Sequence, residues 1–318
     1  MKAYLGIDTS CYVTSAALVD QQGTVLIQQR QLLAVKQGSL GLRQSEAVFS
    51  HVRQLPTVLQ PVLHALHGGY ELSGVGVSGV PRLVEGSYMP VFCAGVSMAK
   101  VMADMAQVPL YTFSHQQGHV RAAEIGQDTL PAAYLAIHLS GGTTEILRIE
   151  RTSWQIERLG GTLDISAGQC IDRLGVALGL SFPAGPALEM LAMQASEPAE
   201  PIGIQVRGCN LHFSGAESIC KRRIEQGEAP AIVAKALFTS IGRALARALG
   251  HAYEQTGLTT ALLAGGVAAN QIVQQSCQRQ LKSRRIPVCL RVADLQYAGD
   301  NAAGIALLAK EADACSVN

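Results

Sequence analysis

The sequence predicts an α/β protein in which one kind of lobe occurs twice, and three observations support this prediction. The chain has 318 residues, a length that favours about two domains, each with a sizeable apolar core. An apolar strand at residues 4–8 runs into a polar turn and two further strands, and the same order begins again at residues 134–138. Helical spacing of apolar residues follows the first group of strands. We therefore expect two related lobes.

The expected elements follow the spacing of the apolar residues. In the first lobe we expect strands at 4–8, 15–19 and 24–27, a helix over 46–67 broken at Pro56, a strand at 74–78 and a helix over 91–106. In the second lobe we expect strands at 134–138, 145–149 and 154–158, and a strand that leads into a helix at 262–270. The first lobe comprises residues 1–112 together with a C-terminal helix in 293–318, and the second comprises 113–292.

A repeated strand meander of this kind is the plan of actin, the sugar kinases and the heat-shock ATPases. In those proteins the turns after the first strands approach the phosphates of a nucleotide from opposite sides. The predicted fold is therefore a duplicated actin-like ATPase fold with a nucleotide cleft between two lobes. Two unrelated α/β domains that share a common strand pattern remain the alternative.

The amino-acid composition disfavours some classes of protein. The formal net charge is +1, so a non-specific nucleic-acid binder with a strongly basic surface is disfavoured. Two short basic runs, at residues 221–223 and 282–285, are typical of solvated helix faces and turns, with local RNA contact as the alternative. The irregularly spaced cysteines, with no C-x-x-C pair, are typical of reduced thiols, and no apolar stretch is long enough to span a bilayer. We expect a cytoplasmic protein without a membrane segment.

Two polar turns are candidates for binding phosphate. Each follows the first strand of a lobe, and glycines there allow backbone N–H groups to approach an anion while hydroxyls add further donors. The candidates are Thr9 and Ser10 in the first turn, and Ser140, Gly141, Gly142, Thr143 and Thr144 in the second. Each turn alone is an ordinary tight turn, and it is their equivalent placement that favours a phosphate site.

A third loop could hold the adenosine part of a nucleotide. Residues 262–270 run from an apolar strand through Gly265 and Gly266 into a helix that begins near Asn270. The glycines would let a base or ribose lie against the backbone, and the Asn270 amide could bond a hydroxyl or a ring nitrogen. An ordinary strand-to-helix turn explains the same residues.

A pair of histidines is the candidate metal site. His115 and His119 stand at positions i and i+4, so they lie on one face of a helix and can chelate one divalent ion. Gln116 occupies the place of the glutamate of an H-E-x-x-H metalloprotease, which disfavours proteolysis. Asp300, on a glycine-containing turn before the last helix, is the candidate third ligand. This set suits iron, zinc and several other ions, and two surface histidines are the alternative.

Taken in order, these motifs resemble those of the TsaD family of threonylcarbamoyl-transfer proteins, over nearly the whole chain. The matching segments are Leu5-Gly6-Ile7-Asp8-Thr9-Ser10-Cys11, residues 114–119, 140–144, 162–164, 167–168, Asp172, 183–186, 213–215, 264–270 and 299–301. The resemblance implies that His115, His119 and Asp300 bind a metal ion. It also implies that Ser140 to Thr144, Asp172, Gly185 and Asn270 bind ATP, AMP or an acyl-adenylate, with Asp172 on the ribose hydroxyls.

The resemblance implies a reaction and partners as well. The metal would polarise a phosphate or carbamoyl oxygen of threonylcarbamoyl-adenylate, and the amine of a tRNA adenosine would attack and release AMP. A smaller TsaB-like protein, or a second copy of this chain, is the expected protein partner. The helix over 91–105 carries apolar residues on more than one face, which suits such a partner or a buried central helix.

Four departures from the family pattern leave the chemistry open. Tyr12 and Val13 replace an acidic pair, Thr143 replaces a histidine, Glu217 replaces a lysine, and Val80-Pro81-Arg82 replaces a Gly-Pro-Gly turn. The first hypothesis is a metal-dependent carbamoyl or threonylcarbamoyl transferase. The second is an ATP- or AMP-binding paralog that regulates the genuine tRNA-modifying complex, and the third is a metallopeptidase.

Overall fold

The computed structural model describes residues 1–10, 12–34, 42–127, 129–197 and 199–316. The backbone forms two compact units, Met1–Ile125 with Gln296–Asn318, and Gly126–Leu295. These boundaries differ from the expected ones at 112/113 and 292/293. The difference arises because residues 113–125 finish a strand and form a helix that both pack within the first unit, so they belong with it.

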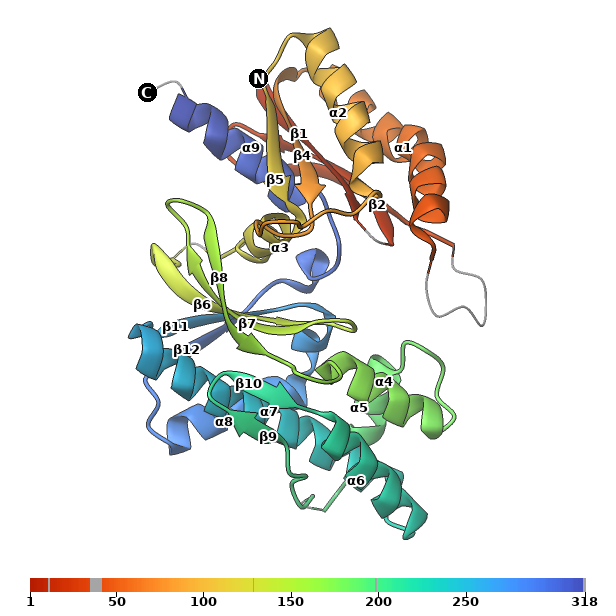
Figure 1. Ribbon diagram of the computed structural model, residues 1–318, viewed down its shortest axis with the longest axis vertical. Coiled ribbons are helices and arrows are strands. Elements are labelled where there is room, and N and C mark those ends of the chain that lie inside the picture. Colours follow the sequence, from red (N-terminus) through yellow and green to blue (C-terminus); the bar gives the residue numbers. More distant parts are fainter. Residues whose placement is uncertain (11, 35–41, 128, 198, 317–318) are drawn as a thin grey trace. The chain divides into compact units, whose positions relative to one another are not determined.

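The first unit is built on a five-stranded sheet in the order β3-β2-β1-β4-β5 (Figure 1). Its strands are β1 (Lys2–Ser10), β2 (Val13–Asp20), β3 (Val25–Leu32), β4 (Glu71–Val80) and β5 (Leu110–Ser114). β1, β2 and β3 form an antiparallel meander, whereas β4 and β5 add in parallel on the other side of β1. Parallel strands are usually buried on both faces, and β1 is buried from Ala3 onward.

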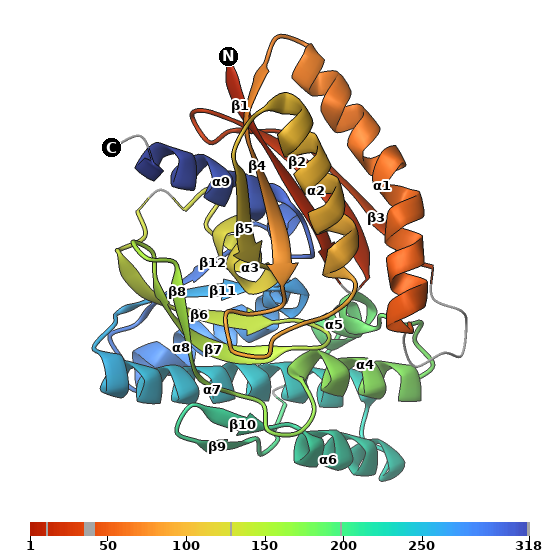
Figure 2. The ribbon, with the colours of Figure 1, turned by 45° about the horizontal axis from the view of Figure 1, so that its top comes forward.

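Helices cover both faces of this sheet (Figure 2). They are α1 (Gln44–His67), α2 (Phe92–Ala106), α3 (His115–Ala123) and α9 (Ala303–Ser316). α1 and α2 lie together on one face, and α3 and α9 lie together on the other. Successive residues of β1 point to opposite faces of the sheet. A Cβ on Gly6 would collide with α9 on one face, whereas Ile7 points toward α2 on the other.

The second unit repeats the strand arrangement. Its sheet has the order β12-β11-β6-β7-β8, in which β6, β7 and β8 form the antiparallel meander and β11 and β12 add in parallel. The elements are β6 (Ala133–Leu139), β7 (Thr144–Glu150), β8 (Gln155–Gly161), α4 (Ala167–Ala177), α5 (Gly185–Met193), β9 (Gln205–Arg207), β10 (Asn210–His212), α6 (Ser214–Glu225), α7 (Pro230–Thr256), β11 (Thr260–Ala264), the 3₁₀ turn Gly266–Ala269, α8 (Gln271–Ser283), β12 (Cys289–Val292) and the 3₁₀ turn Leu295–Tyr297 at the boundary. The predicted duplication is therefore confirmed at the level of strand order.

Two local expectations differ from the structure. β1 extends through Thr9 and Ser10, which pair with Thr14 and Val13, so these two residues belong to the strand and do not form the predicted turn. α1 continues through Pro56 instead of breaking there. A proline removes one helical hydrogen bond, but α1 buries an apolar face against the sheet, and this packing holds the helix together.

Within the described residues, no helix is both long enough and apolar enough to cross a lipid bilayer.

Candidate metal and nucleotide sites

The N-terminus of α3 positions the two predicted metal-binding histidines. Ser114 ends β5 and caps α3, because its Oγ accepts a hydrogen bond from the Gln117 N–H at 3.2 Å and the Gln117 side chain accepts one from the Ser114 N–H at 2.8 Å. This reciprocal capping box fixes the first turn of the helix. His115 and His119 then lie one above the other on the same face of α3.

The loop before α9 positions Asp300. Asn301 is buried, and its amide donates to the carbonyl oxygens of Tyr297 and Gly299 at 3.1 and 2.7 Å while its oxygen accepts from the Ala303 N–H at 3.0 Å. Asn301 thus shapes the turn and caps α9 at once. The neighbouring Asp300 side chain is held at the end of this turn.

Glycines bring α9 and α3 close together. A Cβ on Gly304 in α9 would collide with the carbonyl oxygen of Gly118 in α3, and a Cβ on Gly118 would lie 2.8 Å from Ile305 Cδ1. Only residues without a side chain allow backbones to approach this closely. The close approach carries Asp300, which lies just before α9, toward the histidines of α3.

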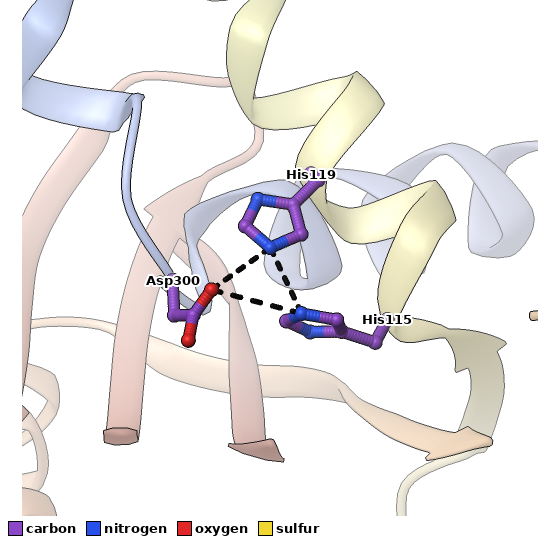
Figure 3. Close-up of side chains that lie close together, drawn as sticks. All are labelled: His115, His119 and Asp300. Carbon is purple, nitrogen blue, oxygen red and sulfur yellow. Dashed lines mark hydrogen bonds and ion pairs between the residues drawn. The ribbon is translucent and has the colours of Figure 1, made fainter. Parts of the chain in front are cut away.

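The three predicted ligand side chains meet in the first unit (Figure 3). Their donor atoms all lie within 4.8 Å of one another, with His119 Nε2 at 3.0 Å from Asp300 Oδ1 and at 2.8 Å from His115 Nε2. Two imidazole nitrogens on one ion lie about 3 Å apart when each metal–nitrogen bond is about 2.0–2.1 Å. The donor types and their spacing therefore fit one divalent ion with little movement of the side chains.

A fourth residue, Asp8 at the end of β1, contacts this cluster. Asp8 Oδ2 lies 2.8 Å from His115 Nδ1, and the Asp8 side chain is buried. Burial alone would lower the pKa of His115, but the charge and hydrogen bond of Asp8, followed by the charge of Asp300, raise this pKa above its usual range. A metal ion bound at His115 would therefore compete with a proton for the ring.

The second unit contains a cavity of about 280 Å³, near the lower end of the range for small-molecule sites. Five of the residues predicted to bind nucleotide line it, namely Gly141, Asp172, Gly185, Gly266 and Asn270. Gly168, Pro183, Pro186, Val267 and Ala269, which also line it, belong to motif segments that were not assigned a binding role, whereas the sequence analysis did not single out the remaining lining residues Ile171, Glu189 and Phe238. This mixture of apolar walls and a few polar groups is typical of small-molecule sites.

The glycine loop between β6 and β7 borders this cavity at the start of α4. Ser166 caps α4, and its hydroxyl also donates to the Gly141 carbonyl oxygen at 2.6 Å. A Cβ on Gly168 would collide with the Ser140 carbonyl oxygen, so the loop lies directly against the first turn of the helix. Cβ atoms on Gly141 and Gly142 would meet nothing within 4 Å, which leaves space beside a helix N-terminus, where anions are stabilised.

Several residues predicted to bind nucleotide also have a role in holding the backbone. Asn270 caps α8 through its Oδ1, which accepts from the Val273 N–H at 2.9 Å, and Thr144 Oγ1 accepts from the Ala167 N–H at 3.0 Å. Gly265 has φ of +100°, and a Cβ there would collide with the Leu139 carbonyl oxygen. Thr143 lies in the glycine loop, and its N–H donates to Ser140 Oγ at 3.1 Å.

Thr9 and Ser10 are both buried in the first unit. The Thr9 hydroxyl donates to the Val91 carbonyl oxygen at 3.0 Å and accepts from the Gly95 N–H at 3.1 Å, so it anchors the start of α2. Ser10 Oγ has no hydrogen-bond partner among the described residues. Cys11, the last residue of the opening motif, lies outside them.

Comparison with known proteins decides the family. A sequence model of the family described as tRNA N6-adenosine threonylcarbamoyltransferase, TsaD, matches residues 27–307, which is most of the chain. The chain belongs to the TsaD family. A relative of this description from Synechococcus sp. (strain CC9902) is 32% identical over 330 residues, covering 96% of this chain and 89% of the relative. Another, from Thermus thermophilus, is 32% identical over 275 residues, covering 85% and 82%.

Solved structures show the same fold at low sequence identity. The activator of 2-hydroxyisocaproyl-CoA dehydratase from Clostridium difficile, with bound ADPNP, has a TM-score of 0.58 at 14% identity and covers 99% of this chain and 97% of its own. A ROK-family glucokinase from Streptomyces griseus has a TM-score of 0.55 at 12% identity, with 97% and 99% covered. These neighbours confirm the predicted actin-like ATPase fold of this TsaD-family chain.

One of the residues that depart from the TsaD pattern, Glu217, forms two ion pairs. Glu217, which stands where the family carries a lysine, lies mostly buried on α6 and pairs with Lys221 Nζ at 2.6 Å and Arg173 Nη1 at 3.2 Å. The replacement therefore does not leave a lone negative charge. Instead, Arg173 and Lys221 neutralise the carboxylate. Glu217 and these two residues line a further pocket of the second unit, which Asp172 also lines.

Proposed function

We propose that this TsaD-family protein is a metal-dependent, adenine-nucleotide-binding transferase that moves a threonylcarbamoyl or carbamoyl group to the amine of an adenosine in tRNA. The relatives with this printed name match most of the chain, and the His115, His119 and Asp300 donors lie within 4.8 Å of one another. The convergence of the three donor side chains is the strongest support, because a paralog without transferase activity would have no physical need for three metal ligands at one point.

The residues of the chain have distinct roles in this proposal. His115 and His119 would offer Nε2 atoms, and Asp300 a carboxylate oxygen, to one iron or zinc ion. When bound, that ion supplies Lewis-acid polarisation of a phosphate or carbamoyl oxygen. In the second unit, the Ser140 to Thr144 loop would bind phosphate oxygens through the N–H groups of Gly141 and Gly142, and Asp172 would accept hydrogen bonds from ribose hydroxyls.

Asp172 can combine this role with a structural one. Its Oδ1 accepts from the Ala184 N–H at 2.8 Å, which fixes the backbone just before Gly185 at the start of α5. The second carboxylate oxygen is the one that we assign to the ribose. Gly185, Gly265, Gly266 and Asn270 would surround the adenosine. In the first unit, the buried Thr9 and Ser10 would shape the end of β1.

Elemental analysis of the purified protein tests the metal part. We expect about one iron or zinc per chain, near-complete loss of the metal in His115→Ala and Asp300→Ala, and full retention in His64→Ala, an exposed histidine on α1. The ligands act together, so removal of either one leaves an incomplete site. Equal metal content in all three variants would reject the assignment.

Complementation tests the transfer reaction. The gene for this chain should restore threonylcarbamoyladenosine to the tRNA of a strain that lacks its own TsaD-family enzyme, measured by mass spectrometry of tRNA nucleosides. A matched Asp300→Ala gene should fail to do so at equal protein level. If the wild-type gene also fails while the protein retains metal and nucleotide, the transferase proposal is wrong.

The second candidate function is a nucleotide-binding paralog that regulates the genuine tRNA-modifying complex. The exchange of a family lysine for Glu217, and of an acidic pair for Tyr12 and Val13, favours it. The complementation outcome just described separates the two candidates, because a regulator would bind metal and nucleotide without transferring an acyl group.

We also propose that the face formed by α1 and α2 binds a protein partner, either a smaller TsaB-like protein or a second copy of this chain. Large apolar side chains are exposed there, among them Phe49, Val52, Val101 and Met105. A shallow apolar groove of about 430 Å³ lies between these helices. Exposed apolar patches of this kind are typical of interaction surfaces.

A further inference from the structure

Asp8 is a buried carboxylate that the proposed mechanism does not use. It lies near the end of β1, beside Ser78 on the parallel neighbour β4, and only 1% of its surface is exposed. Its Oδ1 accepts a short hydrogen bond from the Ser78 hydroxyl, and its Oδ2 lies 2.8 Å from His115 Nδ1. A buried carboxylate is costly unless it is hydrogen-bonded, and these two contacts supply its hydrogen bonds.

The contact with Nδ1 decides what the other ring nitrogen can do. An ionised carboxylate accepts hydrogen bonds and cannot donate one, so the hydrogen of neutral His115 must reside on Nδ1. Nε2 then carries a lone pair. This Nε2 is the atom that faces His119 Nε2 at 2.8 Å and Asp300 Oδ1 at 3.7 Å (Figure 3).

Asp8 therefore contacts the side of the imidazole that faces away from the cluster. It cannot be a fourth ligand through this arrangement, because the ring stands between Asp8 and the point where the three donor atoms converge. We propose that Asp8 is a positioning residue of the metal centre, which fixes the tautomer and orientation of His115 so that Nε2 binds the ion. This inference rests on the proposed metal site.

The fold gives Asp8 this position without any sequence proximity. β1 and β4 pair in parallel with Ile7 opposite Val77, so the next residues, Asp8 and Ser78, lie side by side at the ends of their strands. α3 begins at His115, directly after β5, the strand that pairs with β4. The ends of three adjacent parallel strands thus bring carboxylate, hydroxyl and imidazole together, and Ser78 contacts the carboxylate oxygen that does not face His115.

A purely structural role is the competing explanation, in which Asp8 serves only to tie β1 to β4 through Ser78. The two roles make different predictions for two variants. Asp8→Asn keeps the size of the side chain but removes its charge, and an Asn amide that donates to Nδ1 would force the hydrogen onto Nε2, the metal-binding atom. Ser78→Ala removes the strand tie but leaves the carboxylate on His115.

Metal affinity separates these explanations. Zn²⁺ and Co²⁺ dissociation constants of the full chain are measured by competition with a chromogenic chelator. We expect Asp8→Asn to bind about 10- to 100-fold more weakly than wild type, as is usual when a carboxylate behind a metal-bound histidine is lost, and Ser78→Ala to stay within about threefold. The Co²⁺ absorption spectrum should change in Asp8→Asn and not in Ser78→Ala.

The outcomes are distinct. If wild type binds but Asp8→Asn binds equally well, or if Ser78→Ala loses as much affinity as Asp8→Asn, the positioning role is overturned while the metal site stands. If wild type itself binds neither ion, the metal site and the role of Asp8 fall together.

A measurement on the unmutated protein covers the case in which Asp8→Asn does not fold. Long-range proton–nitrogen NMR spectra of ¹⁵N-histidine-labelled, metal-free wild type, recorded well above neutral pH, report the tautomer of each ring. The His115 signal, assigned with a His115→Gln variant, should show the hydrogen on Nδ1. A hydrogen on Nε2 would overturn the inference whatever the variants do.

Discussion

Single side chains of this protein hold several backbone groups at once, and Asp164 is the clearest case. It accepts hydrogen bonds from the Phe213 N–H at 2.9 Å, the Ser214 N–H at 3.1 Å and the Ser214 hydroxyl at 2.6 Å, at the start of α6. Burial by itself would raise the pKa of Asp164, but these bonds outweigh it and lower the pKa to about 2.

The lowered pKa makes the contribution of Asp164 depend on pH. Because its folded-state pKa lies below the unfolded value near 3.9, the ionised residue stabilises the fold above about pH 4, and this stability is lost as pH falls toward 2. We expect Asp164→Asn to lower the free energy of unfolding by about 1–2 kcal/mol at pH 7 and by progressively less between pH 4 and 2.

Urea unfolding followed by fluorescence of Trp154, the single tryptophan, reports on the unit that contains Asp164. Asp20→Asn, at the end of β2 in the other unit, is the matched control, because the Asp20 carboxylate also accepts from two backbone N–H groups, and it should leave this transition unchanged. A difference between wild type and Asp164→Asn that is constant from pH 7 to pH 2 would contradict the role of the charge.

For single residues of the metal site, the sequence predicted those with a recognisable spacing along the chain. It missed those that come together only through strand pairing. The i, i+4 histidines and the carboxylate on a glycine turn were identifiable, and the structure brings all three together. Asp8 and Ser78 were not identified, because their proximity to His115 depends on strand register. The available signal was the acidic residue that ends the apolar run Tyr4 to Ile7, since a buried strand seldom carries an unpaired charge.

Among the elements, the contact of α3 with α9 controls the candidate metal site. Their backbones approach at Gly118 and Gly304, and this approach sets the position of Asp300 relative to the histidines. A methyl group on Gly304 would meet the backbone of α3, which cannot move aside as a flexible side chain could.

We therefore expect Gly304→Ala to lower the free energy of unfolding by about 1–3 kcal/mol or more and to lower metal content as well. Gly215→Ala on α6 is the matched control, because a Cβ there meets nothing within 4 Å. It should be neutral or stabilising by up to about 1 kcal/mol, since alanine is the better helix former. Thermal unfolding and elemental analysis check both variants, and full metal retention in Gly304→Ala would refute the link between helix packing and the site.

Element prediction succeeded where periodicity was strong and failed at boundaries set by tertiary contacts. The first three strands of each unit were found, but Thr9 and Ser10 were taken as a turn although they pair with β2. The helix after β5 was assigned to the second lobe because nothing in residues 113–125 reveals that they pack on α9. Pro56 does not break α1, because burial of its apolar face outweighs one lost hydrogen bond.

For the whole molecule, the two units follow the same strand order but differ in how the chain builds them. The second is a continuous segment, Gly126–Leu295, with a core drawn entirely from its own residues. The first requires two separate segments, because α9 packs on β1 and β4, where Gly6 and Gly76 leave room for its backbone. Sequence similarity between the strand meanders predicted the duplication, whereas this difference in continuity follows from the position of the last helix.

Because only the second unit is a continuous segment, we expect isolated fragments of the two units to differ in whether they fold. A fragment of residues 126–295 should fold alone, with a cooperative thermal transition by circular dichroism, and should bind AMP, since every residue that lines its cavity is present. A fragment of residues 1–125 should not fold cooperatively, because the apolar surface that α9 covers is exposed and Asp300 is missing. Joining residues 296–318 to residues 1–125 through a flexible linker should restore both folding and metal binding. A fragment 1–125 that folds cooperatively by itself would show that α9 is dispensable, and an unfolded 126–295 would show that its core depends on the other unit.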